Sequence, residues 1–129
     1  MGPFPHDAPK SIITPENPAG TDGFEFVEFA SPDPQELRDL FGRMGYAHVA
    51  NHKTRAIELW QQGDISYVLN AESDSFGARF VEAHGPCAPS MGWRVVDAQK
   101  ALAHAVANGA QEYTGGGKVL DVPAILGIG

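Results

Sequence analysis

Five histidines are the side chains in this sequence best suited to metal chemistry, and their spacing does not bring them together. His48 and His52 fall on one face of an expected strand, but four strand residues span roughly 13 Å, too far for one ion. His104 has a lysine and an asparagine one helical turn away, so we expect an ordinary helix residue. His84 precedes a Gly-Pro pair at an expected helix end, and His6 lies among N-terminal prolines. We therefore expect no metal site in this chain.

The remaining candidates for acid–base or nucleophilic chemistry are two glutamates and one cysteine. Glu25 and Glu28 are three residues apart on an expected strand, so they point to opposite faces and cannot act as a pair. We expect each to meet a cation or water at a strand end, with a cavity-facing role as the alternative. Cys87 lies between two prolines, and His84 is its nearest base. Nucleophilic catalysis needs a lowered thiol pKa and an orienting third group, so we expect Cys87 to be a bystander.

Two further features resemble binding motifs and have simpler structural explanations. Residues 115–117 are three glycines, but a lysine and two apolar residues follow them, whereas a phosphate-binding loop would open a helix. We interpret them as a hairpin turn. Trp60, Tyr67 and Trp93 lie within expected strands, so we expect them in the core rather than on a stacking platform. No residue of the chain is therefore assigned a catalytic, cofactor-binding or metal-binding role.

Composition excludes several classes of partner. The 129 residues carry 9 Lys plus Arg against 16 Asp plus Glu, a net charge of -7, which argues against binding nucleic acid or anionic membranes. A single cysteine excludes an internal disulfide framework and fits a reducing compartment. No apolar run approaches the roughly 20 residues that span a bilayer, and the N-terminus lacks the pattern of a signal peptide. We expect a cytoplasmic protein.

The elements that would position these residues begin after a proline-rich start. Residues 1–22 contain five prolines and are interpreted as an extended arm, with the domain covering residues 23–129. Residues 23–30 are predicted to form a strand that is apolar on both faces. A helix follows, with Asp33 as its N-cap, a proline at the first helical position and Gly45 as its stop.

The rest of the chain repeats this order. Further strands are predicted at residues 46–52, 57–62, 65–70 and 91–96, with a two-residue Gly-Asp hairpin turn between the second and third of these and a short helix that ends at residues 84–86. Asp97 caps another helix that stops at Gly109, and the distance from cap to stop is 12 residues in both helices. We infer two strand-helix-strand-strand-strand units with a period of about 64 residues.

The second unit lacks its last strand in this interpretation. Residues 110–113 and 118–122 are predicted as its two further strands, and the sequence ends soon afterwards. The expected fold class is therefore α+β, with paired βαβββ units and an open sheet edge where the final strand would lie. We expect this edge to be exposed or to be covered by another chain.

These residues resemble bacterial 4-hydroxyphenylpyruvate dioxygenase, and the resemblance runs in order from about residue 17 to the end. The segments that carry it include GFEFVEFAS (23–31), QGDI (62–65), VLN (68–70), HGP (84–86), DAQKA (97–101) and LDVPAILGIG (120–129). The resemblance implies the vicinal-oxygen-chelate fold of paired βαβββ units. It also implies a parent enzyme about three times longer, which converts 4-hydroxyphenylpyruvate and dioxygen to homogentisate and carbon dioxide in tyrosine catabolism.

The same resemblance implies that iron lies outside this chain. In the family, two His and one Glu of the C-terminal catalytic domain bind Fe(II), and this sequence is similar to the N-terminal domain only. Matching the repeated units places Gly23 and roughly Ser90 where the two histidines would be, and neither offers a useful iron ligand. We expect a non-catalytic domain, a piece of the longer enzyme, that packs against the catalytic domain and helps subunits to form a homo-oligomer.

Other functions stay open at this point. The main alternative is a free-standing small-molecule-binding protein of the same superfamily, with apolar residues such as Val27, Phe29 and Trp93 lining a pocket in a dimer. A metal-dependent lyase or isomerase is a third possibility, weakened by the missing ligands. A pure assembly module without any small ligand is the fourth.

Overall fold

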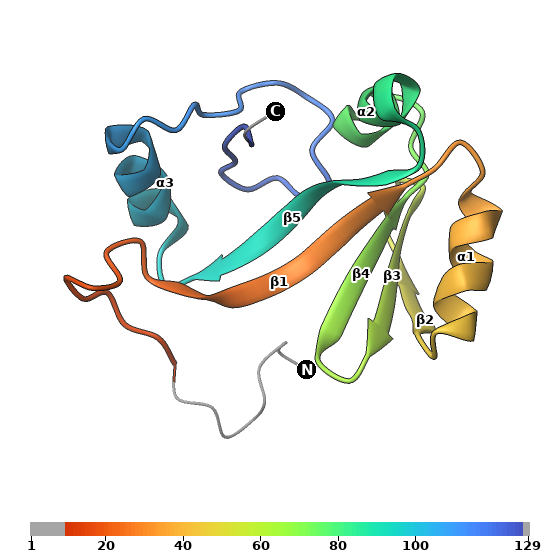
Figure 1. The fold of residues 1–129 in the computed structure, drawn as a ribbon, viewed down its shortest axis with the longest axis horizontal. Helices are drawn as coiled ribbons and strands as arrows, with labels where there is room; N and C mark the ends of the chain where they lie inside the picture. The colour runs from red at the N-terminus through yellow and green to blue at the C-terminus, as the bar shows by residue number, and fades with distance from the viewer. Residues whose placement is uncertain (1–9, 128–129) are drawn as a thin grey trace.

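A single mixed sheet with three helices forms the fold (Figure 1). The computed structural model describes residues 10–127. The strand order in the sheet is β2-β3-β4-β1-β5. The elements are β1 (Thr21–Ala30), α1 (Pro34–Arg43), β2 (Ala47–Asn51), β3 (Ile57–Gln62), β4 (Ile65–Asn70), α2 (Phe76–His84), β5 (Cys87–Val95) and α3 (Ala98–Ala107). The α+β fold class is confirmed.

The first unit contains all five predicted elements. The side chain of Asp33 accepts a hydrogen bond from the Gln35 amide at 3.0 Å, and Pro34 is the first helical residue. The helix stop at Gly45 is confirmed, because this residue has φ +92°, a left-handed conformation that glycine adopts without strain. Strands β3 and β4 have their predicted bounds, and Gly63 at the hairpin turn has φ +57°. The N-cap, the helix-stopping glycine and the hairpin glycine therefore mark the ends of α1, β3 and β4 correctly.

One face of the sheet is covered by α1, which lies beside β2, β3 and β4 in Figure 1. Four buried residues form the core there: Phe41, Tyr46, Trp60 and Leu69. The Phe41 ring lies 5.8 Å from the ring of Trp60 and 5.3 Å from that of Phe29 on β1. These are edge-to-face contacts, a favourable geometry for aromatic pairs.

The opposite face of the sheet has its own small core. Ile57, Val68 and Val119 are buried together, and Phe26 packs against them. Strand β1 thus has apolar side chains on both faces, as predicted from residues 23–30, with Phe29 beneath α1 and Phe26 on the other side.

The second unit begins as predicted and then departs from the expectation. Strand β5 starts at Cys87, four residues before the predicted start, and pairs antiparallel with β1 at one edge of the sheet. Asp97 caps α3 by accepting a hydrogen bond from the Lys100 amide at 3.0 Å, and Gly109 has φ +97°. The cap and the stop of the repeated helix are confirmed. In Figure 1, α3 lies at the far end of β1 and β5 from α1.

The two strands predicted after α3 are wrong. Residues 110–113 make only an isolated bridge to the segment around residue 125, and residues 119–122 form bends. The Tyr113 amide donates to the Ala124 carbonyl, and the Leu126 amide donates to the Gln111 carbonyl, both at 2.8 Å. The hairpin turn predicted at residues 115–117 is therefore wrong as well, since this long loop closes at residues 113 and 124 instead.

We call residues 113–122 the strap, because they cross from the second unit to the first. The carbonyl of Gly117 accepts a hydrogen bond from the Phe76 amide at 3.0 Å, and Gly117 has φ +82°. Arg55 donates to the carbonyls of Lys118 at 2.8 Å and Val119 at 3.2 Å. These contacts satisfy backbone groups that a strand pairing would otherwise have satisfied.

The segment before β1 has more local structure than an extended arm. Asn17 donates to the Thr21 carbonyl at 2.9 Å, and its side-chain oxygen accepts from the Thr21 amide at 3.0 Å. The Val96 amide donates to the Gly20 carbonyl at 2.9 Å, so the end of this segment lies against the end of β5. Strand β1 begins two residues before the predicted domain start at Gly23.

Across residues 10–127, no helix has the length and apolarity needed to cross a lipid bilayer.

Candidate functional site

Metal binding was the first chemistry considered, and the described part of the chain brings no suitable cluster together. Among residues 10–127, no three His, Cys, Asp or Glu side chains are placed to hold one metal ion. The expectation that His48 and His52 share a face is wrong, because an irregularity in the β2–β3 pairing falls after His48. The ring of His48 stacks on Trp60 at 5.0 Å, whereas His52 lies at a cavity on the other face of the sheet.

The other histidines lie apart from one another. His84 is at the end of α2, and its ring lies 4.3 Å from that of Phe80, an arrangement that fits the predicted helix-end role. His104 is in the last turn of α3, where its carbonyl accepts hydrogen bonds from Asn108. His6 lies outside the described residues. The described imidazoles thus lie on separate segments of the chain and do not form a shared site.

The two glutamates of β1 have different environments. Glu25 lies 3.6 Å from Arg94, which agrees with the expected pairing to a cation. Glu28 is only 3% exposed, and the expectation that it meets a cation or water at a strand end is wrong. Its carboxylate accepts hydrogen bonds from Asn70 at 2.9 Å and from the Ser90 hydroxyl. Because buried carboxylates are costly unless hydrogen-bonded, these neutral donors hold Glu28 and join β1, β4 and β5.

Gly23 and Ser90 were singled out as vacated ligand positions. Gly23 has φ +85°, and a Cβ there would meet a nitrogen of Arg94 at 3.5 Å. The hydroxyl of Ser90 is used by Glu28, so it serves the internal network. The equivalence of these two positions to iron-binding histidines stays a prediction.

Cys87 is half-buried at the start of β5. Burial raises the pKa of its thiol, and the charge of nearby Glu28 raises it further. A raised pKa keeps the thiol protonated near neutral pH, which is the opposite of what a nucleophile requires. The environment of Cys87 therefore favours the predicted bystander role.

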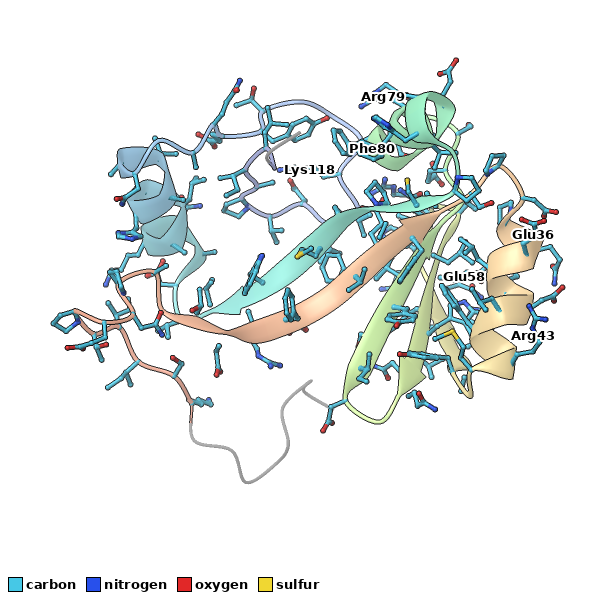
Figure 2. All side chains as sticks on the ribbon, viewed as in Figure 1. Glu36, Arg43, Glu58, Arg79, Phe80 and Lys118 are labelled. Carbon is cyan, nitrogen blue, oxygen red and sulfur yellow. The ribbon has the colours of Figure 1, made fainter. Side chains whose placement is uncertain are left out.

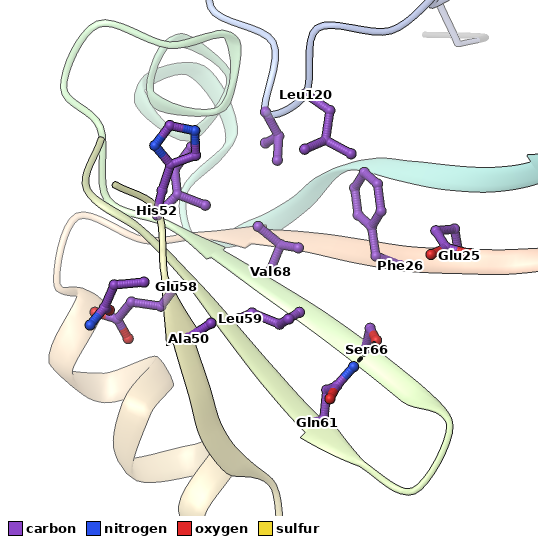
Figure 3. Close-up of a pocket in the computed structure, with 13 residues that line it drawn as sticks. Glu25, Phe26, Ala50, His52, Glu58, Leu59, Gln61, Ser66, Val68 and Leu120 are labelled. Atoms are coloured by element: carbon purple, nitrogen blue, oxygen red, sulfur yellow. Dashed lines mark hydrogen bonds between the residues drawn. The ribbon is translucent and has the colours of Figure 1, made fainter. Parts of the chain in front are cut away.

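A cavity of about 370 Å³ lies on the face of the sheet opposite α1 (Figure 3). It is lined mainly by apolar side chains from β1, β3, β4 and the strap, with polar groups at its edges. The apolar lining consists of Phe26, Ala50, Ile57, Leu59, Val68, Val119 and Leu120, of which Ala50 comes from β2. Ser66 and Gln61 lie together at one end, where the Gln61 amide donates to the Ser66 hydroxyl at 3.0 Å. His52 and Glu25 lie at other edges.

The residues expected to line a pocket in a dimer lie away from this cavity of the single chain. Val27, Phe29 and Trp93 do not line this cavity. Phe29 packs against Phe41 beneath α1, and Trp93 contacts Phe24 at a ring distance of 4.4 Å. Trp93 is 54% exposed, so its predicted core position is wrong too, whereas buried Trp60 confirms the same prediction.

Sequence reasoning could have grouped part of this lining. Ile57, Leu59 and Gln61 share one face of β3, because side chains alternate between faces along a strand. Glu58 and Trp60 on the other face give no polar contrast that would mark either face as the inner one. Val119 could not have been found, because it reaches the cavity through a long connection without secondary structure.

The described arrangement is similar to that of known proteins. Residues 15–129 match the family described as hydroxyphenylpyruvate dioxygenase, HPPD, N-terminal. Hemolysin VllY of Vibrio vulnificus (strain CMCP6) is 46% identical over 118 residues, which cover 88% of this chain and 33% of the relative. A 4-hydroxyphenylpyruvate dioxygenase of Pseudomonas sp. (strain P.J. 874) is 44% identical over 116 residues, which cover 88% of this chain and 32% of the relative. The chain therefore spans about one third of the length of these relatives.

A solved structure gives the same result in three dimensions. It is a fusion protein of a xylose isomerase-like TIM barrel and 4-hydroxyphenylpyruvate dioxygenase, 39% identical, with a TM-score of 0.75. The match covers 91% of this chain and 18% of the fusion protein. Sequence and fold agree that this chain belongs to the family of N-terminal domains of hydroxyphenylpyruvate dioxygenase.

Proposed function

We propose that this chain is the non-catalytic N-terminal domain of a 4-hydroxyphenylpyruvate dioxygenase. The parent enzyme would convert 4-hydroxyphenylpyruvate and dioxygen to homogentisate and carbon dioxide with a non-haem ferrous ion. The observation that carries the proposal is the family match over residues 15–129, combined with relatives of which the chain spans about one third. The proposal includes a cytoplasmic location, supported by the single cysteine.

The side chains of this domain do not fit a ferrous ion. A non-haem iron site takes two imidazoles and one carboxylate on one face of the metal. The most buried carboxylate, Glu28, is held by Asn70 and Ser90, and no imidazole hydrogen-bonds to it among the described contacts. We assign iron binding to the part of the parent protein that lies outside this chain.

A packing role is supported by apolar surface on β1 and β5. Phe24, Met91 and Trp93 are each more than half exposed, and β5 is an edge strand. Contiguous exposed apolar surface and a free strand edge both favour burial against another domain or subunit. We propose that the catalytic domain and further copies of the protein cover these surfaces.

Measurement of oxygen uptake tests whether this domain is non-catalytic while the full-length protein is an active dioxygenase. The isolated chain, supplied with ferrous ion and 4-hydroxyphenylpyruvate, is expected to consume no oxygen above a metal-only control. The full-length protein encoded by the same gene is expected to turn over, and removal of iron by a chelator is expected to stop it. Robust uptake by the isolated chain would refute the non-catalytic assignment, and an inactive full-length protein would refute the parent activity.

The similarity to the fusion protein supports an alternative parent protein, in which this domain would belong to a longer fusion polypeptide. In that case a TIM barrel would accompany the dioxygenase-like part in one polypeptide. The length of the encoding gene separates the two: a frame about three times as long as this chain indicates the dioxygenase alone, and one more than five times as long indicates the fusion. A stop codon directly after Gly129 would refute both and would favour the free-standing binding protein.

A further inference from the structure

The cavity on the sheet face opposite α1 has the construction of a small-molecule site. Its volume of about 370 Å³ falls within the usual range of roughly 300 to 1,000 Å³ for ligand pockets. The floor is formed by inward side chains of three neighbouring strands, including Phe26, Leu59 and Val68. The strap adds Val119 and Leu120 above this floor, as Figure 3 shows for the labelled Leu120. The site therefore combines an apolar floor with a separate covering segment.

The strap is held in place by polar contacts that leave its side chains facing the cavity. Arg55 binds the carbonyls of Lys118 and Val119, and the Phe76 amide binds the carbonyl of Gly117. Val119 is 6% exposed and packs with the floor residues. The segment that covers the cavity is therefore fixed by hydrogen bonds and by packing of Val119.

Two polar groups face the cavity with donors available. The Ser66 hydroxyl accepts from Gln61, so its own proton can be donated to a ligand. The Nδ1 atom of His52 accepts from the amides of Thr54 and Arg55, both at 3.2 Å. Because Nδ1 is the acceptor, the neutral ring carries its proton on Nε2, which makes that nitrogen a donor. Hydroxyl and carbonyl oxygens are the ligand groups that such donors recognise.

The charges around the cavity disfavour anions. Arg55 is bound to strap carbonyls, and Lys118 donates to the Val122 carbonyl at 2.7 Å. Glu25 places a carboxylate at the cavity edge, where Arg94 lies 3.6 Å from it, and the chain carries a net charge of -7. The carboxylate of Glu58 is turned to Arg38 on α1, away from the cavity. The residues that line the cavity include two glutamates and no Lys or Arg, so an anionic ligand would lose its hydration without meeting a cation of the lining.

We propose that this cavity binds a small, neutral, largely apolar molecule that carries one hydroxyl or carbonyl oxygen. The apolar part lies on the apolar floor, and the oxygen accepts a hydrogen bond from the Ser66 hydroxyl. This inference goes beyond the proposed packing function and does not depend on it, because it rests on the cavity of this chain alone.

Titration with a matched pair of compounds tests the proposal. The probe is 4-ethylphenol, the anionic control is 4-ethylbenzoate, and the readout is amide chemical shifts of the ¹⁵N-labelled 129-residue chain. A phenol of nine non-hydrogen atoms is expected to bind with a dissociation constant of about 1 mM. The saturable shifts are expected at Phe26, Leu59, Ser66, Val68 and Val119. The benzoate is expected to bind at least about tenfold more weakly, since it lacks a cationic partner.

Two tryptophan variants test whether the phenol binds in this cavity. Leu59→Trp is expected to fill the cavity and abolish the saturable shifts, whereas Leu40→Trp, at an exposed position on α1, is expected to leave them unchanged. Should Leu59→Trp lose amide dispersion, Ser66→Ala serves instead and is expected to weaken the phenol roughly fivefold.

Four results would overturn the proposal. These are no saturable shift at the solubility limit, shifts confined to the exposed Phe24 and Trp93 surface, equal affinity for the benzoate, and unchanged binding in a folded Leu59→Trp or in Ser66→Ala.

Discussion

Glu58 is an ionisable side chain whose main partner, Arg38, lies 20 residues away in the sequence. Glu58 on β3 is bound at 2.7 Å by Arg38 of α1 and at 3.0 Å by the Trp60 indole (Figure 2 shows Glu58 beside α1). Burial opposes ionisation of Glu58, but the hydrogen bonds from Arg38 and Trp60 outweigh it, so the pKa of its carboxyl lies below the ordinary value of 4.5. The charged form of Glu58 thus fastens the helix to the sheet.

Glu58→Gln tests this fastening through its pH dependence. A lowered folded-state pKa means that the ionised carboxylate stabilises the fold above its unfolded-state pKa, and that this contribution is lost as pH falls through the folded-state pKa. At pH 7 the variant is expected to lose about 1 kcal/mol of unfolding free energy, a modest value because Arg38 is partly exposed. Denaturant unfolding from pH 7 to pH 3 measures the difference.

The difference between Glu58→Gln and the parent chain is expected to close at the acid end. Glu82→Gln, at an exposed position on α2, is the matched control and is expected to change stability little at any pH. A pH-independent loss in Glu58→Gln would assign the effect to packing rather than to charge.

Cys87 gives a second prediction for a single residue. Because burial and then Glu28 raise the pKa of its thiol, less thiolate is present at pH 8 than in an unfolded chain. Alkylation by iodoacetamide is expected to be slower in the native protein than in denaturant. It is also expected to show a half-maximal rate at higher pH. A native thiol that reacts faster than the denatured one would contradict the bystander role and reopen a nucleophilic one.

The strap is the least regular of the connections, and its attachment depends on one glycine. Gly117 has φ +82°, and a Cβ there would lie 2.8 Å from the Phe76 nitrogen and 2.9 Å from the Ser75 Cα. Both contacts are to backbone, which cannot move aside as a flexible side chain would. Gly116, the preceding residue, has open space around it. The two adjacent glycines therefore carry very different constraints.

Gly117→Ala is expected to detach the strap, whereas Gly116→Ala is expected to be tolerated. The first change combines a backbone clash with a strained φ, an effect of about 1 to 3 kcal/mol. Hydrogen exchange of the Phe76 amide, which is bonded to the Gly117 carbonyl, reports the detachment directly. Equal protection of this amide in the two variants would show that the strap does not depend on the glycine conformation.

For the molecule as a whole, the main feature is the exposed apolar surface beside the edge strand β5. The sheet ends at β5, and the aromatic pair of Phe24 and Trp93 is exposed beside that edge. The core, by contrast, is concentrated beneath α1 and around Val119. The apolar side chains beneath α1 are therefore buried within the domain, whereas the apolar side chains Phe24 and Trp93 beside β5 are exposed and available for contacts.

Trp93→Lys tests whether this surface drives self-association. Sedimentation of the 129-residue chain over a range of concentrations is expected to show reversible association, which the lysine weakens by charge and loss of apolar area. Ile65→Lys removes an equally exposed apolar side chain at the β3–β4 hairpin and is the control, expected to sediment as the parent chain does. A monomer at all concentrations would leave the catalytic domain as the proposed occupant and contradict self-association through Trp93.

Much of the fold could be predicted because its signals are local. The Asp33 and Asp97 caps act over two or three residues, and the Gly63 turn acts between adjacent strands. The candidate site could be predicted only in part, since strands β3 and β4 of its floor were predicted with their bounds but the position of the strap was not. The last two predicted strands failed because strand propensity cannot show whether a pairing partner is present.

The sequence by itself determined the order of the elements from β1 to α3, the α+β class and the family, because these depend on caps, turns, periodicity and matched segments. Only the tertiary structure decided which side chains meet. Glu28 is bonded to Asn70 and Ser90, 42 and 62 residues away, and Arg55 reaches a carbonyl 63 residues away. The irregular β2–β3 pairing separates His48 from His52. Contacts across such distances depend on how strands align and loops close, which no local pattern of residues encodes.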